Sequence, residues 1–245
     1  MFRGTPTTDR YQAGTLFVNH ASHFLHFTPH ISTGGKEAIT AKHHFELLAS
    51  TYNHPIKCYH TDNDIFASKE FRSSCIQQNQ RIKFCGVNAH HQNGIAEHHI
   101  CTITERARSM LIHAMISWPD IIQETLWPYA LRLAVDLHNY TPTLSGLSPE
   151  EIFTGIKGRN RLMDFHPFGC PIFVLDPSLQ QGHKIPRWKP RSRVGVYLGL
   201  SPNHASSVPL VLSTTTGLVS LMTISLHHLL FRGSQQLILL QVLLF

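Results

Sequence analysis

The sequence predicts an α/β domain followed by a smaller β-rich module and a Leu-rich tail. Up to residue 157, short β-branched runs alternate with helical patterns, and one long helical stripe follows Gly94. From residue 158 only short β-like runs remain, separated by Pro, Gly and Ser. The 245 residues, 42% hydrophobic and 15% charged, have the composition of a globular protein. We therefore expect parts at 1–157, 158–220 and 221–245.

The first part is expected to alternate strands and helices. A hairpin is predicted at 15–21 and 23–30, then a helix at 34–51, a strand at 56–62, a helix at 67–79 and a strand at 81–86. Helices follow at 94–116, 120–139 and 148–154. Apolar residues at three- and four-residue steps predict one buried stripe on the first of these three helices: Ile100, Ile103, Ala107, Met110, Leu111 and Ala114. In the second part, strands are predicted at 169–175, 193–199 and 208–212.

Two acidic residues occupy positions typical of a site. Asp62 ends the predicted strand at 56–62, and open α/β sheets place their sites at the carboxyl ends of strands. Glu97 lies one turn before the apolar stripe, so we expect it on the buried side of its helix, where a carboxylate is costly unless paired or metal-bound. The ordinary alternatives are a turn residue for Asp62 and a helix-N-terminal acid for Glu97.

Asp62 and Glu97 belong to two of several short motifs that follow one another along the sequence. They are His60-Thr-Asp-Asn, Gly94-Ile-Ala-Glu, Leu126-Trp-Pro-Tyr-Ala, His138-Asn-Tyr-Thr-Pro and Leu147-Ser-Pro-Glu-Glu-Ile-Phe-Thr-Gly. Together they resemble the integrase of copia-type retrotransposons, a part of the Pol polyprotein, over residues 7 to 220. The sequence departs from that family at Asn19, where relatives usually have Asp, and at His23, where they have a basic residue.

The resemblance implies a fold and a chemistry. The fold is a ribonuclease-H-like core, a mixed sheet flanked by helices, followed by a small SH3-like β-barrel. The chemistry is DNA strand transfer with two Mg²⁺ (or Mn²⁺) ions held by two Asp and one Glu. By motif, Asp62 is the second carboxylate and Glu97 the third. The resemblance places the first Asp on the central strand, one hairpin before the strand at 15–21, so we expect a truncated copy with an incomplete two-ion site.

Two other acids are candidate substitutes for that first Asp. Asp9 is the one acid before Glu37, but its Thr-rich turn favours a local hydrogen-bonding role. Asp64 lies past the end of the predicted strand, where solvation is expected.

Positive charge indicates a nucleic-acid partner. The formal net charge is +6, and no acid follows Asp176. A basic cluster around Trp188 suits a phosphate backbone, although a solvated loop is the alternative. We expect DNA contacts from the Gly86–Asn93 loop and its surroundings, from the long helix and from this basic cluster: Asn63, His90, Gln92, Asn93, Arg106, Arg108, Lys184, Arg187, Lys189 and Arg191.

The remaining features narrow the functional classes. The five cysteines form no CxxC pair, and there is no HExxH, so a zinc ribbon and a zinc hydrolase are disfavoured. No signal peptide or membrane span is expected, and a functional copy would act on element ends and target DNA in the nucleus, as a homo-oligomer. Three classes stay open: a strand-transfer enzyme, a catalytically inactive DNA-binding remnant, and a domesticated protein-binding domain.

Overall fold

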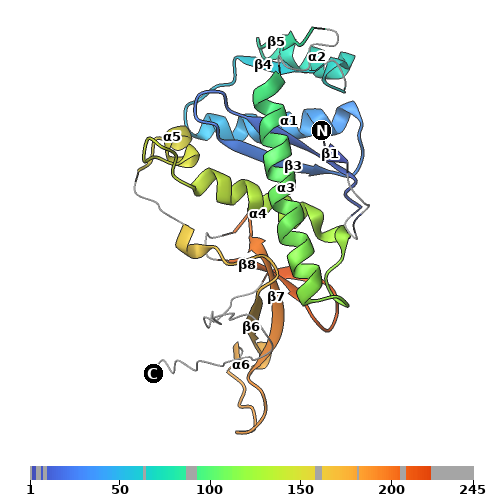
Figure 1. Ribbon diagram of the computed structural model, residues 1–245, viewed down its shortest axis with the longest axis vertical. Coiled ribbons are helices and arrows are strands. Elements are labelled where there is room, and N and C mark those ends of the chain that lie inside the picture. Colours follow the sequence, from blue (N-terminus) through green and yellow to red (C-terminus); the bar gives the residue numbers. More distant parts are fainter. Residues whose placement is uncertain are drawn as a thin grey trace. The chain divides into compact units, whose positions relative to one another are not determined.

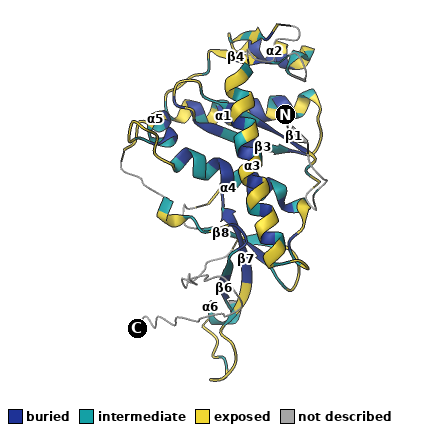
Figure 2. Ribbon diagram, in the orientation of Figure 1, coloured by how far each residue is buried: buried dark blue, intermediate teal, exposed yellow. Residues whose placement is uncertain are grey.

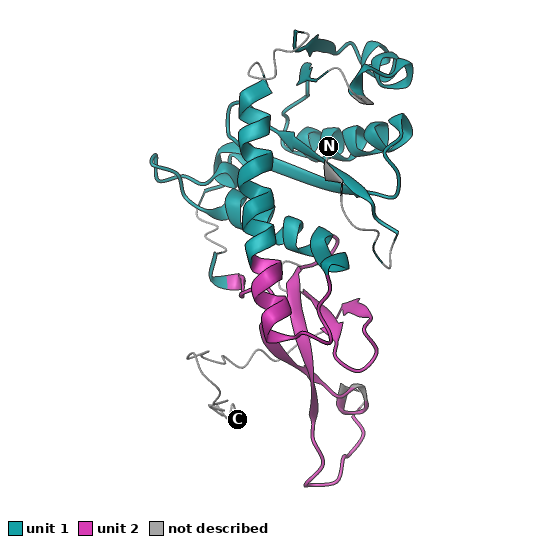
Figure 3. Ribbon diagram, turned by 45° about the vertical axis from the view of Figure 1, so that its right-hand side comes forward, with its two compact units in different colours: residues 1–109, 124–163 teal, residues 110–123, 164–245 magenta. Residues whose placement is uncertain are grey.

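The computed structural model describes residues 2–3, 7, 10–62, 65–86, 93–157, 162–180, 182–204 and 208–221 (Figure 1). The chain forms two compact units (Figure 3). Unit 1 comprises residues 1–109 and 124–163, and unit 2 comprises residues 110–123 and 164–245. Within the described residues, no helix is long and apolar enough to cross a membrane.

The first sheet of unit 1 is antiparallel, with the order β1-β2-β3. Its strands are β1 (Phe2–Arg3), β2 (Ala13–Val18) and β3 (Leu25–His30). The β2–β3 hairpin confirms the predicted one, with β2 displaced toward the amino terminus. Asn19 shapes the turn, because its Oδ1 accepts hydrogen bonds from the backbone N–H groups of Ala21 and Ser22 at 3.1 and 3.0 Å.

An aromatic core joins this sheet to α1 (Gly35–Thr51) and α5 (Pro149–Thr154). The rings of Phe17 and Phe45 stack with centroids 5.1 Å apart, and those of Phe24 and Phe153 stack at 4.3 Å. Ser148 begins α5 with a capping box, in which its hydroxyl and the Glu151 carboxylate satisfy each other's backbone N–H. In Figure 2, buried residues alternate with intermediate and exposed ones along α1, as expected for a helix with one face on the core.

A second, parallel sheet consists of β4 (Cys58–Thr61) and β5 (Arg81–Phe84). The 3₁₀ turn η1 (Ile65–Ala67) and α2 (Lys69–Gln77) connect them, and Ser68 caps α2 through the backbone N–H of Phe71. The single mixed sheet implied by the family resemblance is not formed by the described residues, since β4 pairs with β5 and not with β2.

The long helix α3 (Gly94–Ser117) confirms the predicted one, and Ile103, Ala107, Leu111 and Ala114 are buried as the stripe predicts. The following helix begins later than predicted. Residues 118–123 form turns, η3 covers Glu124–Leu126 and α4 covers Trp127–Tyr140, with a proline in the first turn of α4. Proline is favoured at that position, because the N–H it lacks has no intrahelical partner there.

In unit 2, four strands form an antiparallel sheet in sequence order: β6 (Pro171–Leu175), β7 (Ser192–Leu200), β8 (Pro209–Ser213) and β9 (Val219–Leu221). The first three match the predicted runs, and β9 is additional. Short helical segments η4 (Leu162–Asp164) and α6 (Pro177–Gln180) lie before and after β6. Within this unit, Trp118, which directly follows α3, donates from Nε1 to the Gly169 carbonyl at 2.8 Å.

Candidate functional site

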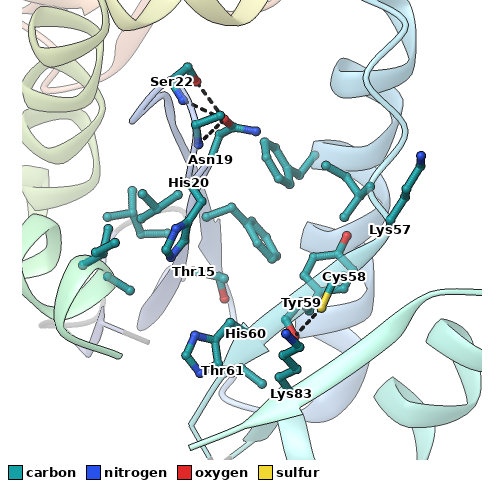
Figure 4. A pocket seen from close by; sticks show the side chains of 18 of the residues that line it. Thr15, Asn19, His20, Ser22, Lys57, Cys58, Tyr59, His60, Thr61 and Lys83 are labelled. Carbon is teal, nitrogen blue, oxygen red and sulfur yellow. Dashed lines mark hydrogen bonds between the residues drawn. The ribbon is translucent and has the colours of Figure 1, made fainter. Parts of the chain in front are cut away.

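Unit 1 contains a pocket of about 880 Å³ (Figure 4). Strand β2 and its turn line it on one side, and residues 53–62, which include β4, line another. Asn93, just before α3, and Ile95, Ala96 and Ile100 in its first turns also line the pocket. The pocket thus brings together the two segments in which the sequence predicted site residues, the end of β4 and the start of α3.

Asp62 lies directly after β4, as predicted, and lines this pocket. The side chain is half-buried, and its Oδ1 is buried without a hydrogen-bond donor among the described residues. A buried carboxylate oxygen without a partner is costly, and a bound cation removes that cost. Among the described residues that line the pocket, Asp62 is the one acid, and Lys57 and Lys83 are its lysines.

Glu97 lies in the first turn of α3, but the expectation that it is buried is wrong. Its side chain is exposed, and Glu97 is not among the residues that line the pocket. The buried positions of α3 run back from Ala107 through Ile103 to His99 in four-residue steps. Because a helix turns about 100° per residue, Glu97 points about 200° away from His99.

The described residues fit only part of the metal site that the family resemblance implies. Asp62 offers an unpartnered oxygen, which suits one ligand of a divalent cation. However, no group of three or more His, Cys, Asp or Glu side chains in the described ranges could hold a metal ion. Asp9 and Asp64 lie outside the described residues. A complete two-ion site is therefore not formed by the described part of the chain.

The residues of unit 1 that were predicted to contact DNA lie in different places. Asn93 lines the pocket, whereas Asn63, His90 and Gln92 lie outside the described residues. Arg106 and Arg108 are exposed on α3. Arg108 Nη1 lies 3.8 Å from Glu105 Oε2, and a pair so exposed leaves the guanidinium accessible to a phosphate.

The predicted basic cluster of unit 2 occupies the segment between α6 and β7. Its four cationic side chains are exposed, and Trp188 among them is 93% exposed: Lys184, Arg187, Lys189 and Arg191. A large exposed aromatic ring between cations is the combination that stacks on bases and attracts phosphates.

A histidine cluster at one end of the first sheet was not predicted from the sequence. His23 Nδ1 lies 3.2 Å from His99 Nε2, so one of the two nitrogens carries the shared proton. His138 Nε2 donates to the His23 carbonyl at 3.0 Å. Burial, together with the neighbouring His138, His23 and His98, lowers the pKa of His99 to about 4. The three rings connect the β2–β3 turn to α3 and α4.

No protein-family model matches the sequence, and no curated protein matches it. Among solved structures, the chain is similar to a chain of the simian T-cell lymphotropic virus intasome in complex with the PP2A regulatory subunit B56 gamma. That match has 15% identity and a TM-score of 0.49, and covers 92% of this chain and 75% of that chain.

The chain is also similar to the HTLV-2 integrase catalytic core domain in complex with magnesium. The dimeric form matches with 18% identity and a TM-score of 0.44, over 62% of this chain and 92% of that one. The trimeric form matches with 18% identity and a TM-score of 0.43, over 60% and 88%. Likenesses of this degree leave the function to be argued from the residues themselves.

Proposed function

We propose that this chain is a copia-type integrase domain that binds DNA, with Asp62 as a divalent-cation ligand. The observation that carries the proposal is the Asp62 carboxylate at the end of β4, whose buried Oδ1 has no donor among the described residues. It lies in the motif His60-Thr-Asp by which the sequence resembles that family. A turn residue with only a structural role would be expected to use its buried oxygen for a local hydrogen bond.

DNA is the partner that the charge distribution favours. The pocket beside Asp62 contains Lys57 and Lys83, and α3 exposes Arg106 and Arg108. Unit 2 adds its own exposed basic cluster with Trp188. Phosphate attraction requires only positive charge, and stacking on an aromatic ring tolerates any base. We therefore expect binding with little sequence preference.

Strand transfer requires a more complete metal site than DNA binding does. In-line displacement at phosphorus uses two adjacent cations to stabilise the attacking and leaving oxygens together. The described residues offer one well-placed ligand in Asp62 and an exposed Glu97. We therefore expect this chain alone to bind DNA without detectable strand transfer. The enzyme is the second candidate function, and it requires a further carboxylate such as Asp9 or Asp64.

In the same proposal, the β6–β9 sheet is the SH3-like module of the family, and Mg²⁺ or Mn²⁺ is the cation. Intact relatives act as oligomers on element ends and target DNA, so a nuclear location is expected for a functional copy.

Fluorescence anisotropy with a short duplex, titrated with salt, tests the binding claim. Replacing Arg187 and Lys189 by Ala should weaken binding and reduce the log–log salt slope by about 2, because each lost phosphate contact contributes about 0.9. The matched control replaces Lys36 and Lys69, two exposed lysines of unit 1, and should leave the slope unchanged. Equal effects of both pairs would show that only net charge matters and would remove the cluster's role.

A strand-transfer assay with Mg²⁺ or Mn²⁺ tests the second claim on the same protein. The expected result is no product from the wild type or from Asp62→Asn. Product from the wild type that disappears in Asp62→Asn would establish the enzyme and contradict the binding-only account.

A further inference from the structure

Residues 182–191 form a loop between α6 and β7, and backbone hydrogen bonds hold both of its ends. The Asp176 N–H donates to the Arg191 carbonyl at 2.9 Å, and the His183 N–H donates to the Ser178 carbonyl at 2.9 Å. In Figure 2 the loop beside α6 is mostly exposed. The loop therefore extends into solvent from a base that is fixed within unit 2.

A tight turn at residues 186–189 carries Trp188. The Lys189 N–H donates to the Pro186 carbonyl at 3.0 Å, which is the hydrogen bond of a β-turn with Arg187 and Trp188 at its centre. A proline fixes its own φ, so Pro186 and Pro190 stiffen the chain on both sides of Trp188. A stiff turn has little conformational freedom to lose when it binds a ligand.

The Trp188 ring is available to a ligand because it gives little to the fold. Tryptophan is on average a well-buried residue, but Trp188 is 93% exposed. Apolar surface that stays in water does not contribute to the stability of the folded state. Substitution of Trp188 should therefore change ligand binding without changing the stability of unit 2.

Cationic side chains lie on both sides of the ring. Arg187 and Lys189 are exposed, and they directly precede and follow Trp188 in the chain. Residues two apart in a chain are separated by at most about 7 Å. A ring with a cation on either side within so short a span suits one nucleotide, with its base on the ring and its flanking phosphates on the cations.

Base pairing decides whether DNA can use the ring. Inside a duplex, neighbouring base pairs cover both faces of every base, and a side chain reaches a face only by unstacking them at a cost. An unpaired base exposes a face, and every kind of base has one. Phosphates attract Arg187 and Lys189 in paired and unpaired DNA alike. The cations thus bind both forms, and the ring distinguishes between them.

We infer that the 182–191 loop is a site for unpaired DNA bases, in which Trp188 stacks on one base while Arg187 and Lys189 bind the neighbouring phosphates. The inference rests on the DNA binding proposed above and adds that the DNA is unpaired where it meets this loop. An anionic membrane is the other partner that suits tryptophan beside cations. Membrane-surface anchors use a broad apolar face, however, and this loop exposes one large apolar side chain.

The test uses the full chain and three fluorescent DNAs that share one duplex. The first is blunt, the second has a single-stranded extension of thymidines, and the third has the same extension with abasic sites in place of the thymidines. The two extended DNAs have equal numbers of phosphates and differ only in their bases. The wild type should bind the thymidine extension about tenfold more tightly than the abasic one, since stacking of one base contributes a factor between about 5 and 150.

Three variants assign this preference to the ring. Trp188→Leu keeps an apolar side chain without a ring, so it should bind both extended DNAs as weakly as the wild type binds the abasic one. Trp188→Phe keeps a smaller ring and should retain part of the preference. Leu144→Ala, at an exposed apolar position of unit 1, is the matched control and should bind like the wild type.

Two further measurements accompany the binding curves. The thymidine extension should quench indole fluorescence in the wild type and leave that of Trp188→Leu unchanged. The melting temperatures of all variants should equal that of the wild type, because the replaced side chains are exposed.

Four results would overturn the inference. Equal wild-type affinity for the thymidine and abasic extensions would exclude stacking and leave the proposed DNA binding intact. A preference that persists in Trp188→Leu would place base recognition elsewhere. Binding to phosphatidylserine vesicles that depends on Trp188, with no such dependence on DNA, would make a membrane the partner. Failure of the wild type to bind any of the three DNAs would contradict the proposed function and this inference with it.

Discussion

Replacing Lys42 by Met should destabilise unit 1 because Lys42 is a buried charge at the centre of a polar network. Its side chain is fully buried on α1, with Nζ 2.9 Å from Glu46 Oε1 and 3.2 Å from Ser74 Oγ of α2. Glu46 also accepts hydrogen bonds from the Tyr59 hydroxyl at 2.8 Å and from Gln80 Nε2. The network therefore connects α1 with α2, β4 and the residue before β5.

The size of the expected loss of stability depends on the carboxylate that the substitution leaves without its cation. Met keeps most of the volume of Lys42, so the main effect is a Glu46 carboxylate that is 13% exposed and lacks its cation. Removing one partner of a buried ion pair costs about 3–5 kcal/mol. Tyr59 and Gln80 still donate to Glu46, so we expect the free energy of unfolding to fall by about 3 kcal/mol, at the lower end of this range. The double variant Lys42→Met/Glu46→Gln removes both charges and should regain most of that loss.

The pH dependence gives a second readout. Burial alone would raise the pKa of Glu46, but hydrogen bonds from Lys42, Gln80 and Tyr59 outweigh it and hold the pKa below its usual value of 4.5. A folded-state pKa below the unfolded one contributes stability that is present above pH 4.5 and lost as the pH falls through the folded value. Lys42→Met should weaken this acid dependence.

Urea unfolding of the wild type, both single variants and the double variant, at pH 7 and at several values below 4.5, measures these effects. The double-mutant cycle isolates the coupling between the two side chains. If Lys42→Met lost less than about 1 kcal/mol and kept the acid dependence, the network would not stabilise the protein as described.

Three further predictions concern other contacts. Asn139→Ala should cost about 2–3 kcal/mol in urea unfolding, because its buried amide bonds both backbone groups of Leu25 at 2.9 and 2.8 Å; a cost near zero would contradict this. Because burial and nearby histidines lower the pKa of His99 from 6.5 to about 4, stability should fall by up to about 3 kcal/mol as the pH falls from 6.5 to 4. In His99→Gln that fall should shrink, and an unchanged pH profile would exclude the histidine as its source. Gly169→Ala should lower the melting temperature, because Gly169 has φ +82° and an added Cβ would lie 2.5 Å from Ala114 Cβ; an unchanged value would show that the turn relaxes.

Local patterns in the sequence were sufficient to predict most of the helices and strands. The apolar period of α3 predicted the burial of Ile103 and Ala107, and alternation with turn residues predicted the β2–β3 hairpin. The same apolar period wrongly predicted that Glu97 is buried. A helix face that includes both Ile100 and Ile103 is so wide that it also takes in Glu97, which faces solvent. Helix α4 begins later than predicted, because Pro128 is favoured in a first helical turn and marks the start of the helix there.

Contacts between distant segments could not be predicted from such patterns. Whether β4 pairs with β5 or with β2 depends on the whole packing of unit 1, and strand alternation alone does not decide it. The His23, His99 and His138 cluster unites three elements that are far apart in sequence. Asp62 was singled out by its position at a strand end, but its unpartnered buried oxygen is visible only in three dimensions.

The central claim is that Asp62 is a cation ligand, and Mn²⁺ binding by the full chain tests it most directly. Water-proton relaxation during a Mn²⁺ titration should reveal a site in the wild type that is at least about tenfold weaker in Asp62→Asn, whereas the exposed control Asp120→Asn should bind like the wild type. Without metal, Asp62→Asn should be at least as stable as the wild type, because it removes a charge from a partly buried group with an unpartnered oxygen. Equal Mn²⁺ affinity in the wild type and Asp62→Asn, or a metal-free loss of about 2 kcal/mol or more in that variant, would contradict the account and assign Asp62 a structural role.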